Sequence, residues 1–322
     1  MNEDDIRVDF WDVGQGDSSS LTLPDGNMIF IDVGPPENGM LYWMANRSSC
    51  LIEHLILTHN DLDHVGGLEK MLGSNVVINN AYLINDDENK RVLRLYKKLK
   101  AAGTNIARLE CESNKPRVIF QWTDYVLELR FPNMQDAINK RSPNEISGII
   151  CLRYKDKDCI IWGADNKLST IASHSDASTH TLFGPHHGAP LNFDKEVERD
   201  SIHKLSPKLC FISTGHNGYG HPNREYIREL AQNRCQVMCS QVTKNCCKKL
   251  WERGQDINDS MALYGLSQSR RKPKSTTVQC NGHVRGYLDK NGIFSLDSYS
   301  DGHAGRIEAL AMNLPCEIPK SR

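Results

Sequence analysis

The sequence predicts an α/β fold, with one sizeable domain followed by a small Cys-rich C-terminal appendage. Its 322 residues allow one domain of roughly 220–250 residues plus a smaller unit. Apolar segments of strand length, broken by Gly, Pro and Asp, are interspersed with helical segments. Near residue 234 the composition becomes Cys-rich, and then basic and polar. We therefore predict a domain at residues 1–240 and an extension at residues 241–322.

The predicted elements begin with strands. Short strands are expected at residues 6–13, 20–23, 28–33 and 55–57. A Pro-Asp-Gly-Asn turn before residue 28 indicates a hairpin. A helix-like stretch follows at residues 65–72. A second helix is expected at residues 88–102, because Val92, Leu95 and Leu99 follow the spacing of an amphipathic helix.

The second half of the chain predicts a further set of strands. They are expected at residues 117–122, 125–131, 149–154, 159–162 and 209–213. A Lys-Asp-Lys-Asp turn indicates that residues 149–154 and 159–162 form a hairpin. A helix is expected at residues 224–232, and weaker strand signals lie at residues 281–287 and 293–296.

The composition narrows the class of protein. Hydrophobic residues make up 39% and charged residues 25%, which permits a packed core and excludes wholesale disorder. The net charge of −1 argues against a globally basic nucleic-acid binder, although a local basic groove stays open. The acidic N-terminal sequence has no apolar signal core, and no apolar run approaches a membrane span. We therefore expect a cytoplasmic protein without membrane association, whose eleven cysteines are mostly reduced.

The sharpest chemical signal directly follows the strand expected at residues 55–57. His59, Asp61, Asp63 and His64 are four possible metal ligands within six residues, too many polar groups to face a core. The first two can share one ion, and the last two can hold a second. The alternative is a polar loop in which one aspartate caps a helix. Because such a pattern arises by chance with a probability of roughly 10⁻³, a metal site is the better prediction.

This segment resembles the His-x-[His/Asp]-x-Asp-His motif of the metallo-β-lactamase fold. Asp at the third position, with Gly-Gly after the motif, is similar to the soluble domain of the competence protein ComEC and its stand-alone relatives. Further segments match the family's motifs in order: Asp12–Asp17, Ile31–Gly34, Asn144 with Ser147, Gly163–Asp165, Pro185–Gly188 and Tyr219–Pro222. One of them departs from the family's Thr-Gly-Asp, because Ala164 separates its Gly from its Asp.

The resemblance implies an αββα sandwich with a dinuclear metal centre. It implies a metal-dependent hydrolase, most simply a phosphodiesterase or nuclease with a DNA or other nucleic-acid substrate. Asp165 follows an apolar strand and is expected to bridge the two ions, with a helix N-cap as its alternative. Of the adjacent His186 and His187, we expect the first to complete the ligand set and the second to contact substrate or support the ligands.

Other residues are expected to support the centre. Asp17, Asp32 and Asn144 are predicted to orient the ligands, with ordinary turn roles as the alternative for the two aspartates. Asp63 is also expected to take a proton during the reaction. His221 is a candidate general acid or phosphate contact, or a loop histidine bonded to backbone.

Tyr219 belongs to the same loop as His221, and its ring could stack on a base or simply cover the loop.

The ligand types also indicate which ions are preferred. The centre is expected to hold two divalent ions, with Mn²⁺, Mg²⁺ and Zn²⁺ as candidates. Asp61 replaces a histidine of the zinc-hydrolase form of the family motif, and no histidine lies at residues 144–147. The first site is therefore rich in oxygen, which lets Mn²⁺ or Mg²⁺ compete with Zn²⁺.

The cysteines of the extension raise the question of a further, structural zinc ion. Candidate ligands are Cys239, Cys246, Cys247, Cys280 and His283. Their spacing is not that of a zinc ribbon. The alternative is that Cys235 and Cys239 are small buried hydrophobic residues on a final strand.

Two other functions stay open at the level of the sequence. The protein could be a non-nuclease metallo-hydrolase that acts on lactones or thioesters. It could also be an effector subunit that a partner protein activates, within a multi-protein system such as phage defence.

Overall fold

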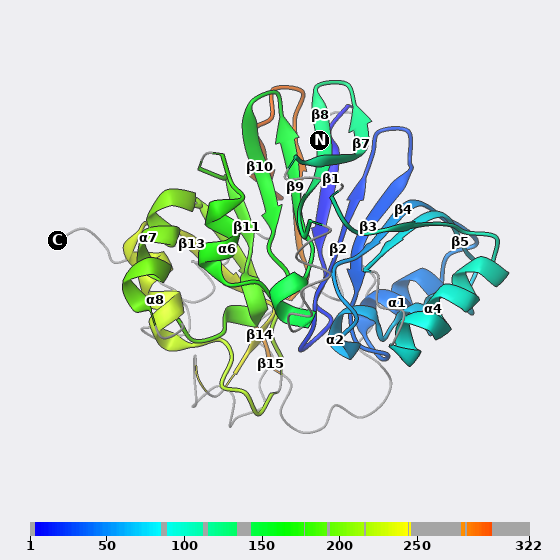
Figure 1. The fold of residues 1–322 in the computed structure, drawn as a ribbon, viewed down its shortest axis with the longest axis horizontal. Helices are drawn as coiled ribbons and strands as arrows, with labels where there is room; N and C mark the ends of the chain where they lie inside the picture. The colour runs from blue at the N-terminus through cyan, green and yellow to red at the C-terminus, as the bar shows by residue number, and fades with distance from the viewer. Residues whose placement is uncertain are drawn as a thin grey trace.

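The structure is a computed structural model, which describes residues 4–84, 89–111, 115–133, 143–176, 178–191, 194–215, 217–243, 245, 278–280 and 282–297. Over these residues two large β-sheets pack face to face, and helices cover both outer faces (Figure 1). A two-stranded sheet lies near the lower end of the molecule in this view. The predicted α/β class and the αββα sandwich are therefore confirmed.

The first sheet has the strand order β17-β16-β1-β2-β3-β4-β5-β6. Its strands in chain order are β1 (Ile6–Phe10), β2 (Ser18–Thr22), β3 (Met28–Val33), β4 (Cys50–Leu57), β5 (Val76–Leu83), β6 (Asn105–Arg108), β16 (Val284–Leu288) and β17 (Phe294–Leu296). The strands from β3 to β6 are parallel, whereas β1, β2, β16 and β17 pair in antiparallel fashion.

The second sheet has the order β13-β12-β11-β10-β9-β8-β7. Its strands are β7 (Arg117–Trp122), β8 (Tyr125–Phe131), β9 (Ile149–Tyr154), β10 (Lys157–Trp162), β11 (Thr181–Phe183), β12 (Leu209–Ile212) and β13 (Gln236–Cys239). The strands from β10 to β13 are parallel, and β7 to β10 form an antiparallel meander. The small sheet pairs β14 (Gln241–Val242) with β15 (Val278–Gln279).

Helices cover the outer face of each sheet. On the first sheet they are α1 (Gly39–Ala45), α2 (Leu62–Val65), α3 (Leu68–Leu72) and α4 (Lys90–Ala101). On the second they are α6 (Leu168–Ser173), α7 (Lys195–Leu205) and α8 (Arg224–Gln232). Two short 3₁₀ helices, η1 (Pro143–Ile146) and η2 (Pro185–Gly188), lie in connecting loops.

Side-chain alternation along the strands divides the interior into three apolar layers. In β3, Ile29 and Ile31 face the second sheet, whereas Phe30 faces the helices of its own sheet. In β10, Trp162 belongs to the central layer and Ile161 to the layer under α6 and α7. Both faces of these strands are covered, which explains why they are nearly continuous apolar runs in the sequence.

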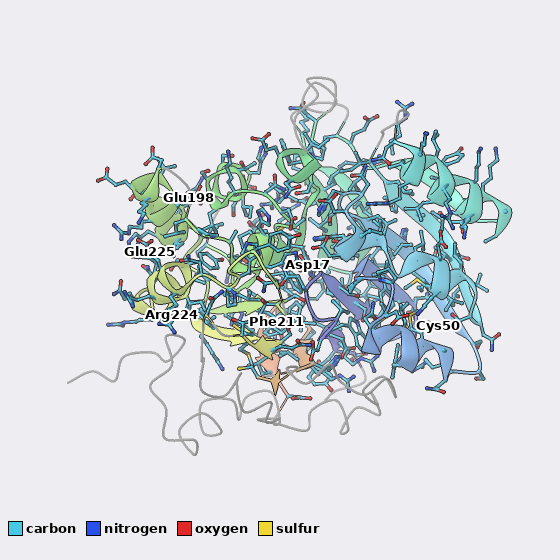
Figure 2. All side chains as sticks on the ribbon, turned by 90° about the horizontal axis from the view of Figure 1, so that it is seen from below. Asp17, Cys50, Glu198, Phe211, Arg224 and Glu225 are labelled. Atoms are coloured by element: carbon cyan, nitrogen blue, oxygen red, sulfur yellow. The ribbon has the colours of Figure 1, made fainter. Side chains whose placement is uncertain are left out.

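The parallel strands of both sheets end at the same edge of the sandwich. The polar segments at residues 58–64, 163–166 and 184–188 follow β4, β10 and β11 directly. Seen from this edge, Asp17 lies near the middle of the molecule, between the helices of the two halves (Figure 2). Loops after the carboxyl ends of parallel strands are where α/β proteins bind ligands, so the topology gathers the predicted site residues at one edge.

Three features of the fold differ clearly from the sequence prediction. The helix expected at residues 65–72 is two helices, broken at Gly66 and Gly67, whose lack of a side chain admits close contacts with Leu62 and Val33. β4 starts at Cys50, well before the expected strand at residues 55–57. β16 and β17 lie beyond residue 240, yet they extend the first sheet next to β1. The first sheet therefore takes strands from both sides of the predicted domain boundary.

Among the described residues, no helix combines the length and apolar character needed to span a bilayer.

Candidate metal centre

The loop after β4 presents its polar side chains to one point instead of capping a helix. Asp61 occupies the N-cap position of α2, but its side chain makes no capping hydrogen bond. Its carboxylate Oδ2 lies 3.7 Å from His59 Nε2. The imidazoles of His59 and His64 are both buried, with ring centroids 4.0 Å apart. This arrangement disfavours the helix-capping alternative for Asp61.

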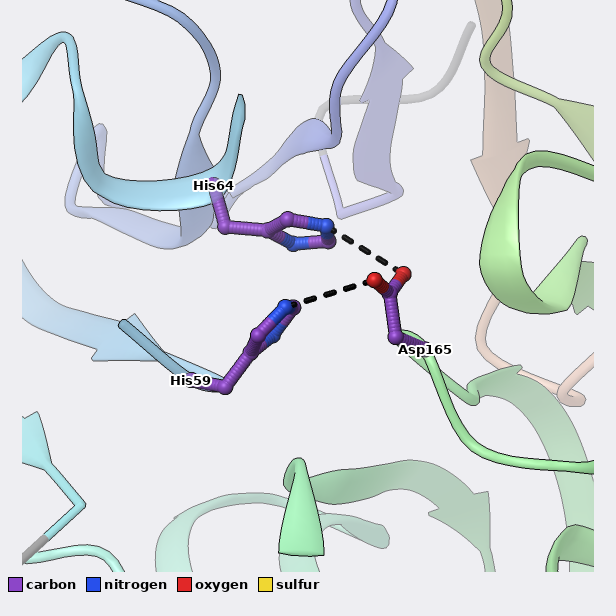
Figure 3. Close-up of side chains that lie close together, drawn as sticks. All are labelled: His59, His64 and Asp165. Carbon is purple, nitrogen blue, oxygen red and sulfur yellow. Dashed lines mark ion pairs between the residues drawn. The ribbon is translucent and has the colours of Figure 1, made fainter. Parts of the chain in front are cut away.

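Asp165 faces this loop from the other sheet, and its two oxygens face different groups. Oδ2 lies 3.4 Å from His59 Nε2 and 3.9 Å from His186 Nε2. Oδ1 lies 3.3 Å from His64 Nε2 and 3.8 Å from His187 Nε2. Figure 3 shows the Asp165 carboxylate with one oxygen toward His59 and the other toward His64. A carboxylate in this position is suited to bridge two cations.

The two adjacent histidines have different surroundings. His187 is buried, and its Nε2 lies 3.2 Å from Asp63 Oδ2. Its ring belongs with Asp63 and His64 to one group of converging ligand atoms. The side chain of His186 is 39% exposed, and its nearest carboxylate oxygen, on Asp165, is 3.9 Å away. The geometry therefore favours His187 as the ligand, the reverse of the order expected from the sequence.

Each buried histidine of the centre is held through its Nδ1. His64 Nδ1–H donates to Asp32 Oδ2 at 2.8 Å, and His187 Nδ1–H donates to the Ser213 carbonyl at 3.0 Å. His59 Nδ1 lies 3.2 Å from Thr58 Oγ1, which itself donates to Asp32. Carboxylates and carbonyls only accept, and the Thr58 hydroxyl donates its own proton to Asp32. These partners therefore place a proton on each Nδ1 and leave each Nε2 as the atom that can bind a metal ion.

The inward-facing atoms of the centre lack hydrogen bonds of normal geometry. Among the described residues, the Nε2 atoms of His59, His64 and His187 and the Oδ1 atom of Asp165 are buried without such a partner. Buried polar atoms are ordinarily paired, because leaving one unpaired costs roughly 1–3 kcal/mol. Lone pairs of nitrogen and oxygen that face one another across 3.2–3.8 Å need a cation or shared protons between them. This donor set fits divalent metal ions.

The carboxylates and histidines shift one another's titration. Burial lowers the pKa of His64, but the carboxylates of Asp165 and Asp32 outweigh burial and hold this pKa well above its usual range. Burial also opposes the charge of His187, yet Asp17, Asp63 and Asp165 raise its pKa to about 10. The same proton positions would be occupied by metal ions, because metal binding to such ligands displaces protons.

Asp32 anchors the ligand loop from the end of β3. Its Oδ1 accepts from the backbone N–H of Thr58 at 2.8 Å, and its Oδ2 accepts from the Thr58 hydroxyl at 2.6 Å and from His64. Asp17 lies on the other side, with Oδ1 3.1 Å from His187 Nδ1. Both aspartates are placed to orient histidines of the centre, as expected for residues that support metal ligands.

Strained backbone accompanies these side chains. The non-glycine residues Asp32, Ala164, His186 and His187 have φ values of 57°, 46°, 50° and 53°. Such left-handed conformations cost of order 1–3 kcal/mol each and cluster at functional sites, where the surrounding structure enforces them. Gly188, with φ 73°, continues the same tight turn, and a Cβ there would meet Pro222 at 2.9 Å.

Two further predicted residues lie beside the centre. Asn144 Nδ2 is 3.4 Å from both Asp165 Oδ2 and His186 Nε2. His221 is buried, with its ring centroid 5.5 Å from that of His186 and 6.2 Å from that of His187. Burial, followed by the charges of these histidines, lowers the pKa of His221 to about 4.

Thr58 and Ser213 are contributors that the sequence did not single out. Thr58 joins Asp32 to His59, and the Ser213 carbonyl holds His187. The Ser213 hydroxyl donates to the Gly16 carbonyl, which ties the end of β12 to the loop before Asp17. The position of Thr58 at the strand end, directly before the ligand motif, is the signal that could have identified it.

Among the described residues, the cysteines of the extension belong to no cluster of converging metal-ligand atoms. Cys239 and Cys280 are buried in the apolar layer beneath α8, together with Cys235, as the hydrophobic alternative predicts. His283 Nε2–H donates to Asp9 at 2.8 Å, so this nitrogen serves the junction of β1 and β16 instead of a zinc ion. Cys246 and Cys247 lie outside the described residues.

Comparisons with known proteins give distant relatives. No protein-family model matches the chain. ComE operon protein 3 of Bacillus subtilis is 22% identical over 259 residues, which are 72% of this chain and 31% of that protein. The chain thus spans about a third of the length of this curated relative.

Solved structures of similar shape include Igni18, a metallo hydrolase from the archaeon Ignicoccus hospitalis. It is 15% identical with a TM-score of 0.46, and the match covers 72% of this chain and 94% of Igni18. A diphosphatase from the PhnP family is 14% identical with a TM-score of 0.42, over 72% of this chain and 94% of that chain. A long form of RNase Z from yeast is 9% identical with a TM-score of 0.38, over 67% and 38%.

Proposed function

We propose that this protein is a metal-dependent hydrolase that cleaves phosphodiester bonds of nucleic acid. One observation carries the proposal. Three buried histidines, each held through Nδ1, turn unpaired Nε2 atoms toward the carboxylates of Asp63 and Asp165 at an edge where parallel strands end. The motif resemblance to ComEC-type domains supports the choice of phosphodiesters over other substrates.

The residues divide into two ligand groups around Asp165. One group, which would hold an ion, consists of His59, Asp61 and Asp165 Oδ2, and the other, which would hold a second, consists of Asp63, His64, His187 and Asp165 Oδ1. Two bound divalent ions would supply an activated water nucleophile and stabilise negative charge on the phosphoryl oxygens. Asp63, whose side chain is 34% exposed, is reachable by water and is proposed to accept a proton from the attacking water.

The charge of the centre explains why an anionic substrate requires the ions. Asp61, Asp63 and Asp165 together would repel a phosphodiester if they were not neutralised. Burial raises the pKa of Asp63, but its contact with His187 and the charge of His64 lower it to about 2, so this carboxylate is ionised at neutral pH. Cation binding therefore converts an anionic pocket into one that accepts phosphate.

The proposed function predicts cleavage that depends on both metal and Asp63. Single- and double-stranded DNA and RNA, incubated with the protein and Mn²⁺, Mg²⁺ or Zn²⁺, should yield products with at least one of these ions. Mn²⁺ or Mg²⁺ should support cleavage better than Zn²⁺, because the first ligand group has one imidazole and otherwise oxygens. Asp63→Ala should lower the rate by about 10³-fold, since a ligand and a proton acceptor are lost together.

Cleavage that persists in Asp63→Ala or in the presence of EDTA would contradict this mechanism. A protein that hydrolyses a lactone or thioester but no phosphodiester would be a metallo-hydrolase of another substrate class. Activity that appears only after a partner protein is added would indicate an effector subunit.

The support from Asp32 gives a separate prediction about metal affinity. Asp32→Asn replaces the acceptor of His64 Nδ1–H by an amide, which disturbs the tautomer of His64 and the anchoring of Thr58. Loss of such support typically weakens metal binding by about 10–100-fold. Competition with a metal-binding dye measures this affinity. Asp25→Asn, in an exposed turn, is the matched control and should bind metal normally, and equal affinities in both variants would contradict the assigned role.

A further inference from the structure

Tyr219 presents an uncovered aromatic ring beside the metal centre. Its side chain is 77% exposed, more than any other large apolar residue of the described chain. Four other accessible aromatic rings carry a cation over one face: Arg47 over Trp43, Lys100 over Tyr96, Arg117 over Tyr82 and Lys155 over Tyr154. Among the described residues, no cation lies over Tyr219. Isolated exposed aromatic side chains are common on protein surfaces, so exposure alone does not indicate a function. The position of the ring and the order of its turn have to be considered as well.

The loop that carries Tyr219 is tightly bonded. Asn217 Oδ1 accepts from the backbone N–H groups of Tyr219, Gly220 and His221 at 3.1, 3.0 and 3.1 Å. Asn217 Nδ2 donates to the carbonyls of Gly215 and His221 at 2.8 and 2.9 Å. One side chain thus fixes the turn, and the ring is exposed although its backbone is held in place. Because the backbone of the turn is already ordered, ligand binding does not have to pay the entropy of ordering it.

The ring is the outermost member of a row that leads to the centre. Its centroid lies 5.8 Å from that of His221, whose own centroid lies 6.2 Å from that of His187. His187 in turn contacts Asp63. A group that stacks on Tyr219 is therefore next to the place where the proposed chemistry occurs, and not on a remote surface.

We propose that Tyr219 is a stacking platform for an unpaired nucleobase of the substrate strand. This inference rests on the proposed function and specifies its substrate as single-stranded or locally unpaired nucleic acid. A flat, uncharged ring on a fixed turn beside the candidate metal ligands suits a base, because every base has a π-face and stacking is tolerant of sequence. A paired base in a duplex keeps its faces covered and is not available to the ring.

The test compares two single-stranded oligomers of equal length, oligo-dT and an abasic deoxyribose-phosphate chain. The wild-type protein should cleave the base-bearing oligomer with a kcat/KM about tenfold higher, mainly through KM, as expected for one stacked base. Tyr219→Phe should keep this preference, whereas Tyr219→Ala should lose it and cleave the abasic chain at the wild-type rate. Tyr96→Ala, which removes an exposed tyrosine of α4, is the control and should match the wild type.

Outcomes for the platform and for the proposed function are distinguishable. If Tyr219→Ala keeps the wild-type preference for oligo-dT, the platform is wrong while the nuclease stands. If the wild type cleaves no single- or double-stranded DNA or RNA with any of the ions, the proposed function fails. Fluorescence anisotropy in Ca²⁺ then tests the platform by itself, because a base-dependent affinity that disappears only in Tyr219→Ala supports stacking, and equal affinities overturn it.

Discussion

Replacing His187 with alanine is expected to lower phosphodiester hydrolysis by about 10³-fold, whereas His186→Ala should lower it by at most about tenfold. The buried ring of His187 lies 3.2 Å from Asp63 and joins the second ligand group, so its loss removes several kcal/mol of charge stabilisation. His186 is 39% exposed and lies at the margin of the first group. The two variants differ by one position in the chain, which makes each the natural control for the other.

Two measurements separate a lost ligand from a damaged fold. Elemental analysis after dialysis should find about one ion fewer per chain in His187→Ala than in wild type and His186→Ala. Added imidazole should partly restore activity to His187→Ala, because it can refill the space left by the ring, but not to Asp63→Ala. If His186→Ala loses the ion and His187→Ala retains it, the ligand order expected from the sequence is the correct one.

Most residues of the candidate centre could be predicted because they belong to short motifs at strand ends. His59, Asp61, Asp63 and His64 occupy one loop, and parallel topology brings Asp165 to the same edge. Spacing alone could not decide which of two adjacent histidines points inward. That choice depends on the left-handed turn at residues 186–188 and on the carbonyl of Ser213, which is distant in sequence.

Elements with weak apolar periodicity were the least predictable part of the fold. In α7 the buried positions include Glu198 and Ser201, so the apolar stripe that marks a helix is nearly missing. For β16 and β17 the sequence indicated strands, but not the sheet to which they belong. Alternation of side chains can indicate a strand, but it does not tell which sheet edge the strand will join.

The pairing of β16 with β1 is held by a buried ionic cluster, and its loss gives the second large prediction. Asp9 is fully buried, and its Oδ1 accepts from His283 Nε2 at 2.8 Å and from Arg285 Nε at 2.6 Å. Its Oδ2 accepts from Arg7 Nε at 2.8 Å. Asp9 and Arg285 are also directly paired residues of the two strands. The carboxylate therefore joins the start of the chain to residues 283–285.

Asp9→Asn should lower the free energy of unfolding by about 3 kcal/mol, toward the lower end of the range for breaking a buried ion pair. The lower end applies because Arg7 and Arg285 are 27% and 17% exposed and can regain water. Urea unfolding measures the loss, and limited proteolysis should show earlier cleavage within residues 284–296. Asp124→Asn breaks an exposed pair with Lys155 and should change stability by no more than about 0.5 kcal/mol.

The pH dependence of the stability difference between wild type and Asp9→Asn tests whether Asp9 is ionised in the cluster. Burial raises its pKa, but the hydrogen bond and charge of His283 and the charges of Arg7 and Arg285 outweigh burial, so the pKa lies far below 3.8. A carboxylate whose pKa is lower in the folded state than in the unfolded state stabilises the fold at pH values above its unfolded-state pKa. This stabilisation is lost as the pH falls from the unfolded-state pKa toward the folded-state pKa. The stability gap between wild type and Asp9→Asn should therefore narrow below about pH 4.

The titration of His283 changes the stability difference between wild type and Asp9→Asn in the opposite direction, at a higher pH. Burial lowers its pKa in the wild type, and Asp9 partly offsets this effect. Without Asp9 the folded state resists protonation of His283 more strongly, so the variant loses more stability than the wild type as the pH falls below about 6.5. The difference in unfolding free energy between wild type and Asp9→Asn should widen slightly from pH 7 to pH 5 and then narrow below about pH 4. A gap that stays constant from pH 7 to pH 3 would mean that Asp9 is not ionised in the folded protein.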